Sequence, residues 1–92
     1  MDAWQVEALD KHYHRVVCEI PTKRILDLLE YDGIITKAAI KSILKFPLGK
    51  RNQALIKLIV DIGLGAFACF LHALSISGQK DLVDLLTVNN TF

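Results

Sequence analysis

Apolar residues recur along this chain at intervals of three and four, the spacing that places side chains on one face of an α-helix. The strict alternation of apolar and polar residues that is typical of a β-strand is almost absent. Glycine and proline divide the chain into segments, and each segment carries one apolar stripe. This pattern predicts six helices, at residues 3–20, 22–31, 37–45, 50–62, 66–76 and 79–87.

Local signals mark where several of these helices begin and end. Pro21 ends the first helix because proline cannot continue helical hydrogen bonding, and Gly33 ends the second because glycine adopts the left-handed conformation without strain. Thr36 is the predicted N-cap of the third helix. A loop is expected at residues 47–49, and residues 88–92 are expected to form a frayed tail.

The apolar stripes also predict the core of the protein. The side chains expected inside are Trp4, Ala8, Leu9, Tyr13, Val16, Val17, Ile20, Ile25, Leu26, Leu28, Leu29, Ala39, Ile40, Ile43, Leu44, Ala54, Leu55, Leu58, Ile59, Ile62, Ala66, Phe67, Phe70, Leu71, Leu74, Leu82, Val83, Leu85 and Leu86. Short helices joined by tight links favour an antiparallel bundle in which sequential helices are neighbours. A chain of 92 residues has room for one such domain.

Composition and net charge restrict the classes of function that this chain could have. The hydrophobic fraction is 52%, so some apolar surface is expected to remain outside the core as a binding face. Eleven basic and ten acidic side chains give a net charge of +1. This balance argues against nucleic-acid binding and against attachment to an anionic membrane, because both require clustered positive charge.

One apolar stretch, residues 54–76, has to be weighed as a membrane segment. It contains Lys57 and Asp61, and such a charge at a bilayer centre costs about 2.5–3.5 kcal/mol. Two amphipathic helices joined by a glycine turn explain the stretch better. The start of the chain lacks the pattern of a secretory signal, and Cys18 and Cys69 are interpreted as reduced thiols. We therefore expect a cytoplasmic protein without a membrane partner.

The chain offers little material for catalysis or metal binding. His14 and Cys18 are four residues apart, and Cys69 and His72 are three apart, so together they could form a zinc site if their helices met. Such spacings arise easily by chance, and no CxxC knuckle accompanies them. No serine or cysteine stands in the local pattern of a hydrolase nucleophile. We expect no metal, no cofactor and no enzymatic activity.

The most specific motifs lie in the second half of the chain. They are A-F-x-x-F-x-x-A-L at residues 66–74 and G-Q-x-x-L-x-x-L-L at residues 78–86, preceded by the run from Arg51 to Asp61. These motifs resemble the last three helices of caspase-recruitment domains (CARDs), a family of the death-fold superfamily. Residues 25–36 are similar to the second helix and the following turn of the apoptosome adaptor's CARD. The resemblance extends from about Leu9 to Leu86.

The resemblance implies a six-helix antiparallel Greek-key bundle with a bent or broken first helix. It also implies that the activity consists only of homotypic CARD–CARD assembly. In the best-known mode, a basic surface of helices one and four meets an acidic surface of helices two and three on the next molecule. Repetition of such a heterologous contact winds the domains into an open helical assembly.

The family's two surfaces are matched only in part. The residues that correspond to the partner-binding basic face are Lys11, Arg15, Lys50, Arg51 and Lys57, and those of the acidic face are Asp27, Glu30 and Asp32. Leu55 stands where initiator caspases often have a basic residue, which would make the basic face thinner. Lys37 and Lys41 stand in place of the adaptor's acidic cluster. This pattern predicts a domain that caps a growing assembly better than it propagates one.

These features predict an interaction module of apoptotic or innate-immune signalling that binds CARD-containing proteins and self-associates weakly. If Met1 and Phe92 are the natural ends, the simplest inference is a CARD-only decoy or inhibitor of a caspase or adaptor CARD. It would be of cellular or viral origin and act in the cytoplasm, that of the host cell if viral. Two alternatives stay open. One is an excised CARD of a larger caspase or adaptor that promotes signalling, and the other is a small structural or DNA-binding bundle with salt-dependent DNA affinity.

Overall fold

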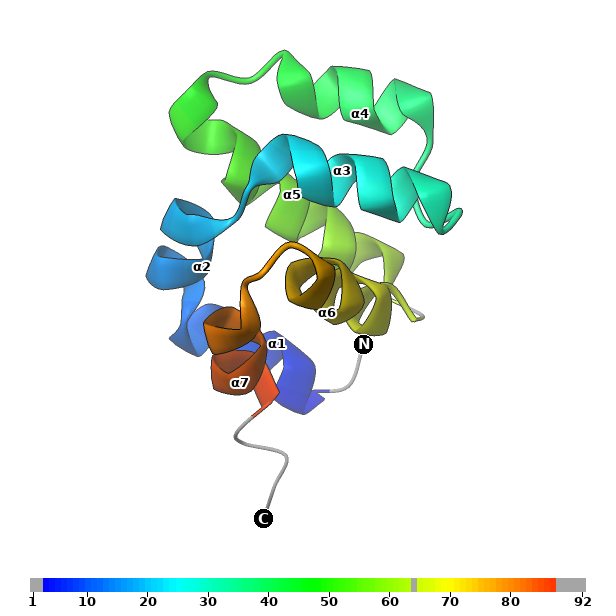
Figure 1. The fold of residues 1–92 in the computed structure, drawn as a ribbon. Helices are drawn as coiled ribbons and strands as arrows, with labels where there is room; N and C mark the ends of the chain where they lie inside the picture. Colours follow the sequence, from blue (N-terminus) through cyan, green and yellow to red (C-terminus); the bar gives the residue numbers. More distant parts are fainter. Residues whose placement is uncertain (1–2, 64, 88–92) are drawn as a thin grey trace.

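A computed structural model describes residues 3–63 and 65–87. In this part the chain forms seven α-helices and no strand (Figure 1). The helices are α1 (Ala3–Lys11), α2 (Tyr13–Glu19), α3 (Thr22–Tyr31), α4 (Lys37–Leu44), α5 (Leu48–Ile62), α6 (Ala66–Ile76) and α7 (Lys80–Thr87). The predicted tail at 88–92, Leu64 in the predicted glycine turn and the side chain of Trp4 lie outside the described part.

The continuous first helix predicted from the apolar stripe is wrong, because the helix is broken at His12 into α1 and α2. The break agrees with the bent or broken first helix that the resemblance implies. His12 has φ −107° and ψ 17°, yet its amide still donates to the Ala8 carbonyl oxygen at 3.1 Å and its carbonyl oxygen accepts from the Val16 amide at 2.9 Å. The break lets the two pieces pack on different neighbours, α1 on α7 and α2 on α5. A straight helix of about 27 Å would hold one direction and could not follow both.

The other predicted boundaries need smaller corrections. Helices α3 and α6 have the predicted bounds, whereas α4 ends at Leu44 and α7 begins at Lys80. The loop predicted at residues 47–49 is wrong, because α5 already begins at Leu48 and includes Gly49. Pro47 stands just ahead of α5, where proline is well tolerated because the first amides of a helix have no intrahelical acceptor.

Two predicted helix signals are confirmed in the structure. The Thr36 hydroxyl accepts a hydrogen bond from the Ala39 amide at 3.2 Å and so caps α4. Gly33 follows α3 with φ 78°, and the Ile34 amide donates to the Leu29 carbonyl oxygen at 2.9 Å. This bond back to the last turn of the helix is the mark of a Schellman stop, which requires a left-handed residue.

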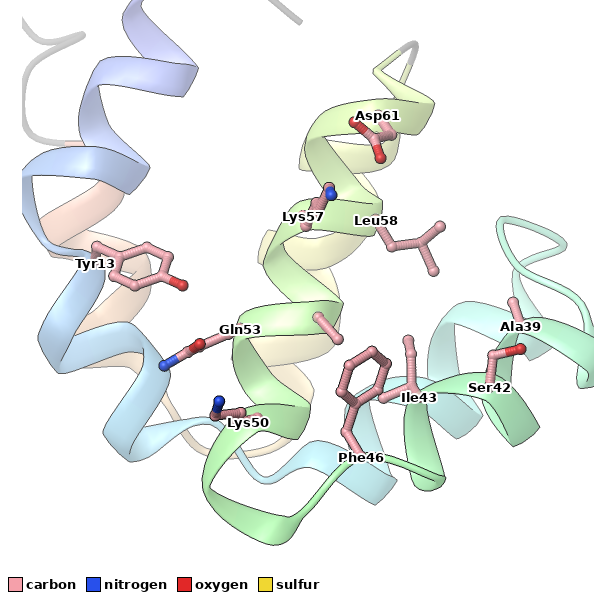
Figure 2. A pocket seen from close by; sticks show the side chains of 11 residues that line it. Tyr13, Ala39, Ser42, Ile43, Phe46, Lys50, Gln53, Lys57, Leu58 and Asp61 are labelled. Carbon is pink, nitrogen blue, oxygen red and sulfur yellow. The ribbon is translucent and has the colours of Figure 1, made fainter.

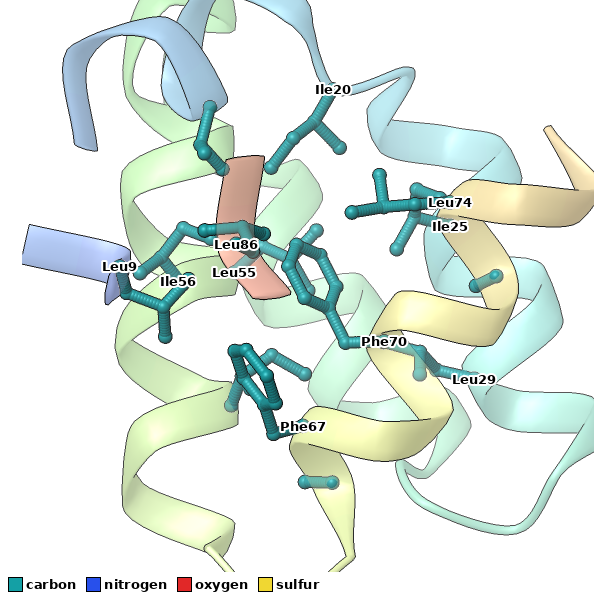
Figure 3. Close-up of a cluster of buried hydrophobic side chains, with 14 of the residues drawn as sticks. Leu9, Ile20, Ile25, Leu29, Leu55, Ile56, Phe67, Phe70, Leu74 and Leu86 are labelled. Carbon is teal, nitrogen blue, oxygen red and sulfur yellow. The ribbon is translucent and has the colours of Figure 1, made fainter. Parts of the chain in front are cut away.

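The core lies between α5, the longest helix, and the helices around it. Helix α5 packs against α2, α3, α4 and α6, and α6 also packs against α3 and α7. Figure 3 shows Phe67 and Phe70 of α6 within the cluster that also contains Leu55 and Ile56 of α5. The largest side chains that are fully buried are Phe67, Phe70, Leu9, Ile25, Leu26, Leu29, Leu55, Ile59, Leu74, Leu82, Leu86 and Val16. The apolar stripes predict all of these inside, but they do not predict the buried Ile35, Ile56 and Ala73.

The apolar stretch at residues 54–76 folds as parts of two helices. Helix α5 ends at Ile62 and α6 begins at Ala66, so the predicted helix–turn–helix is confirmed in the described residues. None of the helices in residues 3–63 and 65–87 combines the length and the hydropathy that crossing a membrane requires. The radius of gyration, 12.2 Å, is that of a compact chain of this length.

A buried polar side chain ties α5 to the link between α2 and α3. Asn52 is 9% exposed, and its amide nitrogen donates to the carbonyl oxygens of Val17 at 2.7 Å and Ile20 at 3.1 Å. Its side-chain oxygen accepts a hydrogen bond from the Thr22 hydroxyl. The Val17 carbonyl lacks the usual amide four residues later, because that residue is Pro21. Asn52 therefore replaces a donor that the backbone cannot supply.

Candidate functional site

A groove of about 650 Å³ runs along the outer side of α5, between α4 and the start of α2 (Figure 2). It is lined by Tyr13, Ala39, Ser42, Ile43, Phe46, Lys50, Gln53, Ala54, Lys57, Leu58 and Asp61. The α5 members are spaced by three and four residues, so they form one continuous stripe on that helix. This stripe is separate from the fully buried residues Leu55 and Ile59, which face the core.

The floor and one wall of the groove are apolar. Ala54 and Leu58 of α5 and Ala39 of α4 are half-buried, and Ile43 of α4 is buried. Phe46, just after α4, is 46% exposed. Figure 2 shows its ring on the α4 side of the groove, with Leu58 directed toward the same side. Apolar surface is therefore left in a concave position, where a partner side chain could be buried.

Two lysines supply the positive charge of the groove. Lys50 and Lys57 are exposed and lie seven residues apart on α5, which corresponds to about 10 Å along the helix. The ion pair found among the described residues joins Arg15 and Glu19, and neither groove lysine has a carboxylate within 4.0 Å. Asp61 lies one turn beyond Lys57 on the same stripe. The groove is thus positive along most of α5 and has one negative charge near the end of that helix.

Arg51, predicted to belong to the basic face, is engaged inside the protein. It is half-buried, and its Nε donates to the Phe46 carbonyl oxygen at 3.0 Å while one terminal nitrogen donates to the Leu44 carbonyl oxygen at 2.9 Å. The Leu44 oxygen lies at the C-terminal end of α4, where helical carbonyls lack intrahelical partners, and the Phe46 oxygen lies in the turn that follows. Arg51 therefore fastens the turn between α4 and α5.

The remaining basic candidates, Lys11 and Arg15, are exposed on α1 and α2 but do not line the groove. The Arg15 Nε lies 2.6 Å from the Glu19 Oε2, and the two side chains are 46% and 39% exposed. An exposed pair of this kind contributes about 0–1 kcal/mol to stability, but it offsets the charge of Arg15.

The inference that Leu55 makes the basic face thinner is wrong, because the Leu55 side chain is fully buried and is not part of any surface.

The predicted acidic face is mixed in charge. Asp27 is exposed on α3, where it shares a shallow hollow with Lys23 and Arg24. Glu30 is half-buried on the same helix, and Asp32 is exposed at its C-terminal cap. Lys23 and Arg24, next to one of the three carboxylates, weaken the negative potential of this side of the molecule.

The structure does not support the zinc alternative. His14 Nε2 and Cys18 Sγ lie 4.0 Å apart on the exposed side of α2, while half-buried Cys69 belongs to α6. Across residues 3–63 and 65–87, no group of three or more His, Cys, Asp or Glu side chains could hold a metal ion. His14, Cys18, Cys69 and His72 therefore do not form a common site.

Several residues of the groove are not predicted as surface residues. The apolar stripe predicts Tyr13 in the core, whereas it is half-buried and borders the groove. Ser42, Phe46 and Gln53 have no predicted role. The available signal was a second stripe in residues 50–61, beside the apolar one, in which lysines alternate with small and apolar residues. Only the position of α4 shows that this stripe is the floor of a groove.

No protein-family model and no curated protein matches the chain. The choice of a function therefore depends on the residues of the groove and on the motifs at residues 66–86.

Proposed function

We propose that this chain is an interaction module of the CARD type, which binds another CARD in the cytoplasm and performs no catalysis. The proposal includes the Greek-key arrangement of the helices that is typical of the death fold. The observation that carries it is the α5 groove, where Lys50 and Lys57 lie beside apolar side chains and have no carboxylate of the described residues within 4.0 Å. Cys18 and Cys69 are both free thiols, which agrees with the reducing environment of the cytoplasm.

The arrangement of the groove suits an acidic partner. Unpaired lysines attract carboxylates over a distance and favour one orientation of the partner, which raises specificity more than affinity. The apolar floor provides the surface whose burial supplies binding energy. A CARD with an acidic face, as in the mode described above, has the complementary charge.

We propose further that the chain binds on one side only. Asp27 shares its hollow with two basic residues, and exposed Lys37 and Lys41 lie on α4, where the resemblance would place acidic side chains. A domain with a competent basic side and a mixed opposite side joins an assembly and receives no further subunit. Binding on one side only supports the role of a decoy or inhibitor of an initiator-caspase or adaptor CARD.

The binding step is tested with the purified chain and a panel of initiator-caspase and adaptor CARDs in a calorimetric titration. The double variant K50E/K57E should weaken binding at least about tenfold, which is about 1.4 kcal/mol. The double variant K37E/K41E carries the same charge change outside the groove and should bind normally. Folded chain that binds no CARD of the panel would contradict the proposal.

One-sided binding has its own test, the polymerisation of the bound partner CARD. Wild-type chain should suppress polymer growth at substoichiometric amounts. K37E/K41E should suppress it less, because the new carboxylates restore an acidic face to which subunits can add. Acceleration by the wild-type chain would contradict the decoy and favour a signal-promoting CARD.

A further inference from the structure

The α5 groove has the shape that receives a helix. Its stripe on α5 runs from Lys50 to Asp61 and has the small side chain of Ala54 near the middle. Tyr13 lies on one flank of the groove and Phe46 on the other (Figure 2). Two helices pack with their axes about 8–10 Å apart, and small residues at the contact favour the closer distance. A flat partner surface would leave Ala54 and Leu58 uncovered, because both are half-buried in the hollow.

The charges of the groove specify what flanks the apolar side of such a helix. Lys50 and Lys57 are two turns apart on α5, so carboxylates seven residues apart on the docked helix have the same spacing, about 10 Å. Asp61 lies beyond Lys57 and repels a third carboxylate at that end. The groove therefore distinguishes an acidic helix from a basic one and disfavours the shifted register.

We propose that the α5 groove receives a single amphipathic α-helix of the partner. An apolar side chain of this helix seats between Phe46 and Leu58 over Ala54, and two carboxylates seven residues apart face Lys50 and Lys57. The inference rests on the proposed function and deepens it, since it identifies the recognised part of the acidic partner as one helix with an apolar anchor. Phe46, at 46% exposure, is the most exposed large apolar residue that lines the groove.

The probe for this inference is a synthetic stapled helix of about four turns. It carries leucines on one face and two glutamates seven residues apart beside them, and a matched peptide has lysines in place of the glutamates. Amide chemical-shift mapping should place the glutamate peptide on the α5 stripe and around Tyr13 and Phe46. The glutamate peptide should bind at least about tenfold more tightly than the lysine peptide.

Variants separate the two kinds of contact. K50E/K57E should reverse the preference, so that the lysine peptide binds about tenfold more tightly than the glutamate peptide. Phe46→Ser should weaken both peptides by about tenfold. Leu48→Ser is the matched control, because Leu48 is 80% exposed and does not line the groove. Thermal melting of each variant identifies any loss that comes from unfolding.

Several results would overturn the inference. These are chemical-shift changes away from the groove, equal binding of the two peptides, or equal effects of Phe46→Ser and Leu48→Ser. A dimer in sedimentation experiments that blocks the peptide would assign the groove to a second copy of the chain. If CARDs bind and Phe46→Ser does not weaken them, the groove inference fails while the proposed function stands. If the peptides behave as expected and no CARD binds, the proposed function fails instead.

Discussion

Replacing Asn52 with aspartate keeps the shape of the side chain and reverses the role of one atom. The nitrogen that donates to the Val17 and Ile20 carbonyl oxygens becomes an oxygen, which can only accept hydrogen bonds when the carboxyl is ionised. The change takes place where the native side chain is 9% exposed, so water can replace the lost donors only in part. The Asn52→Asp variant therefore leaves two carbonyl oxygens facing a carboxylate.

The expected loss of stability follows from these contacts. Each buried acceptor left without a donor costs about 1–3 kcal/mol, and an uncompensated buried charge adds to this. Val17 cannot turn to a backbone amide four residues later, because Pro21 has none. We expect the free energy of unfolding to fall by about 3–5 kcal/mol, a large part of the 5–15 kcal/mol that is typical of a domain.

Urea unfolding followed by far-UV circular dichroism measures this loss. The matched control is Gln53→Glu, the same change on the exposed neighbouring residue, which should alter stability by no more than about 0.5 kcal/mol. Burial and the facing oxygens raise the pKa of the introduced carboxyl in the folded state, so the deficit of Asn52→Asp should shrink as the pH falls and the group becomes a donor. Equal unfolding midpoints of the two variants at neutral pH would refute the role assigned to Asn52.

The remaining predictions concern stability as well. Arg51→Gln removes the guanidinium hydrogen bonds to the Leu44 and Phe46 carbonyl oxygens and should lower the free energy of unfolding by about 1–2 kcal/mol in the same urea assay. Lys50→Gln should change this free energy by no more than about 0.5 kcal/mol, and equal effects would show that the turn does not need Arg51. Gly78→Ala should destabilise by about 1 kcal/mol, because Gly78 has φ 82°, while Gly49→Ala within α5 should stabilise by up to about 1 kcal/mol. An added Cβ meets no atom within 4 Å at either glycine, so opposite shifts in thermal midpoint test the backbone alone, and shifts of one sign would contradict this reason. Phe70→Ala empties a fully buried site and should cost about 3–5 kcal/mol by calorimetry; a loss below about 1 kcal/mol would mean that the core closes around the gap.

Much of the fold could be predicted because its signals are local. Apolar spacing identifies the buried face of every helix, and Thr36 and Gly33 act through hydrogen bonds within a few residues of themselves. The break at His12 could not be predicted from the stripe, since the residues on both sides of it continue the same periodicity. It depends on the directions of α5 and α7, which lie far away in the sequence.

The candidate site was less predictable than the fold. A lysine or arginine on a polar helix face looks the same in the sequence whether it faces solvent, a partner or a backbone carbonyl. Lys50 and Arg51 are adjacent, yet the first borders the groove and the second binds the end of α4. The distinction depends on which way each side chain leaves the helix and on what the neighbouring helix places there.

The sequence by itself determined that this chain is helical, where most helices end, and which side chains leave water, because these properties arise from periodicity and from contacts between near neighbours. Tertiary structure alone decided that α1 and α2 diverge at His12, that Asn52 supplies donors to carbonyls more than thirty residues away, and that α4 turns the outer stripe of α5 into a groove. Each of these features joins segments distant in the chain, and their relative placement is set by how all the helices pack around one core.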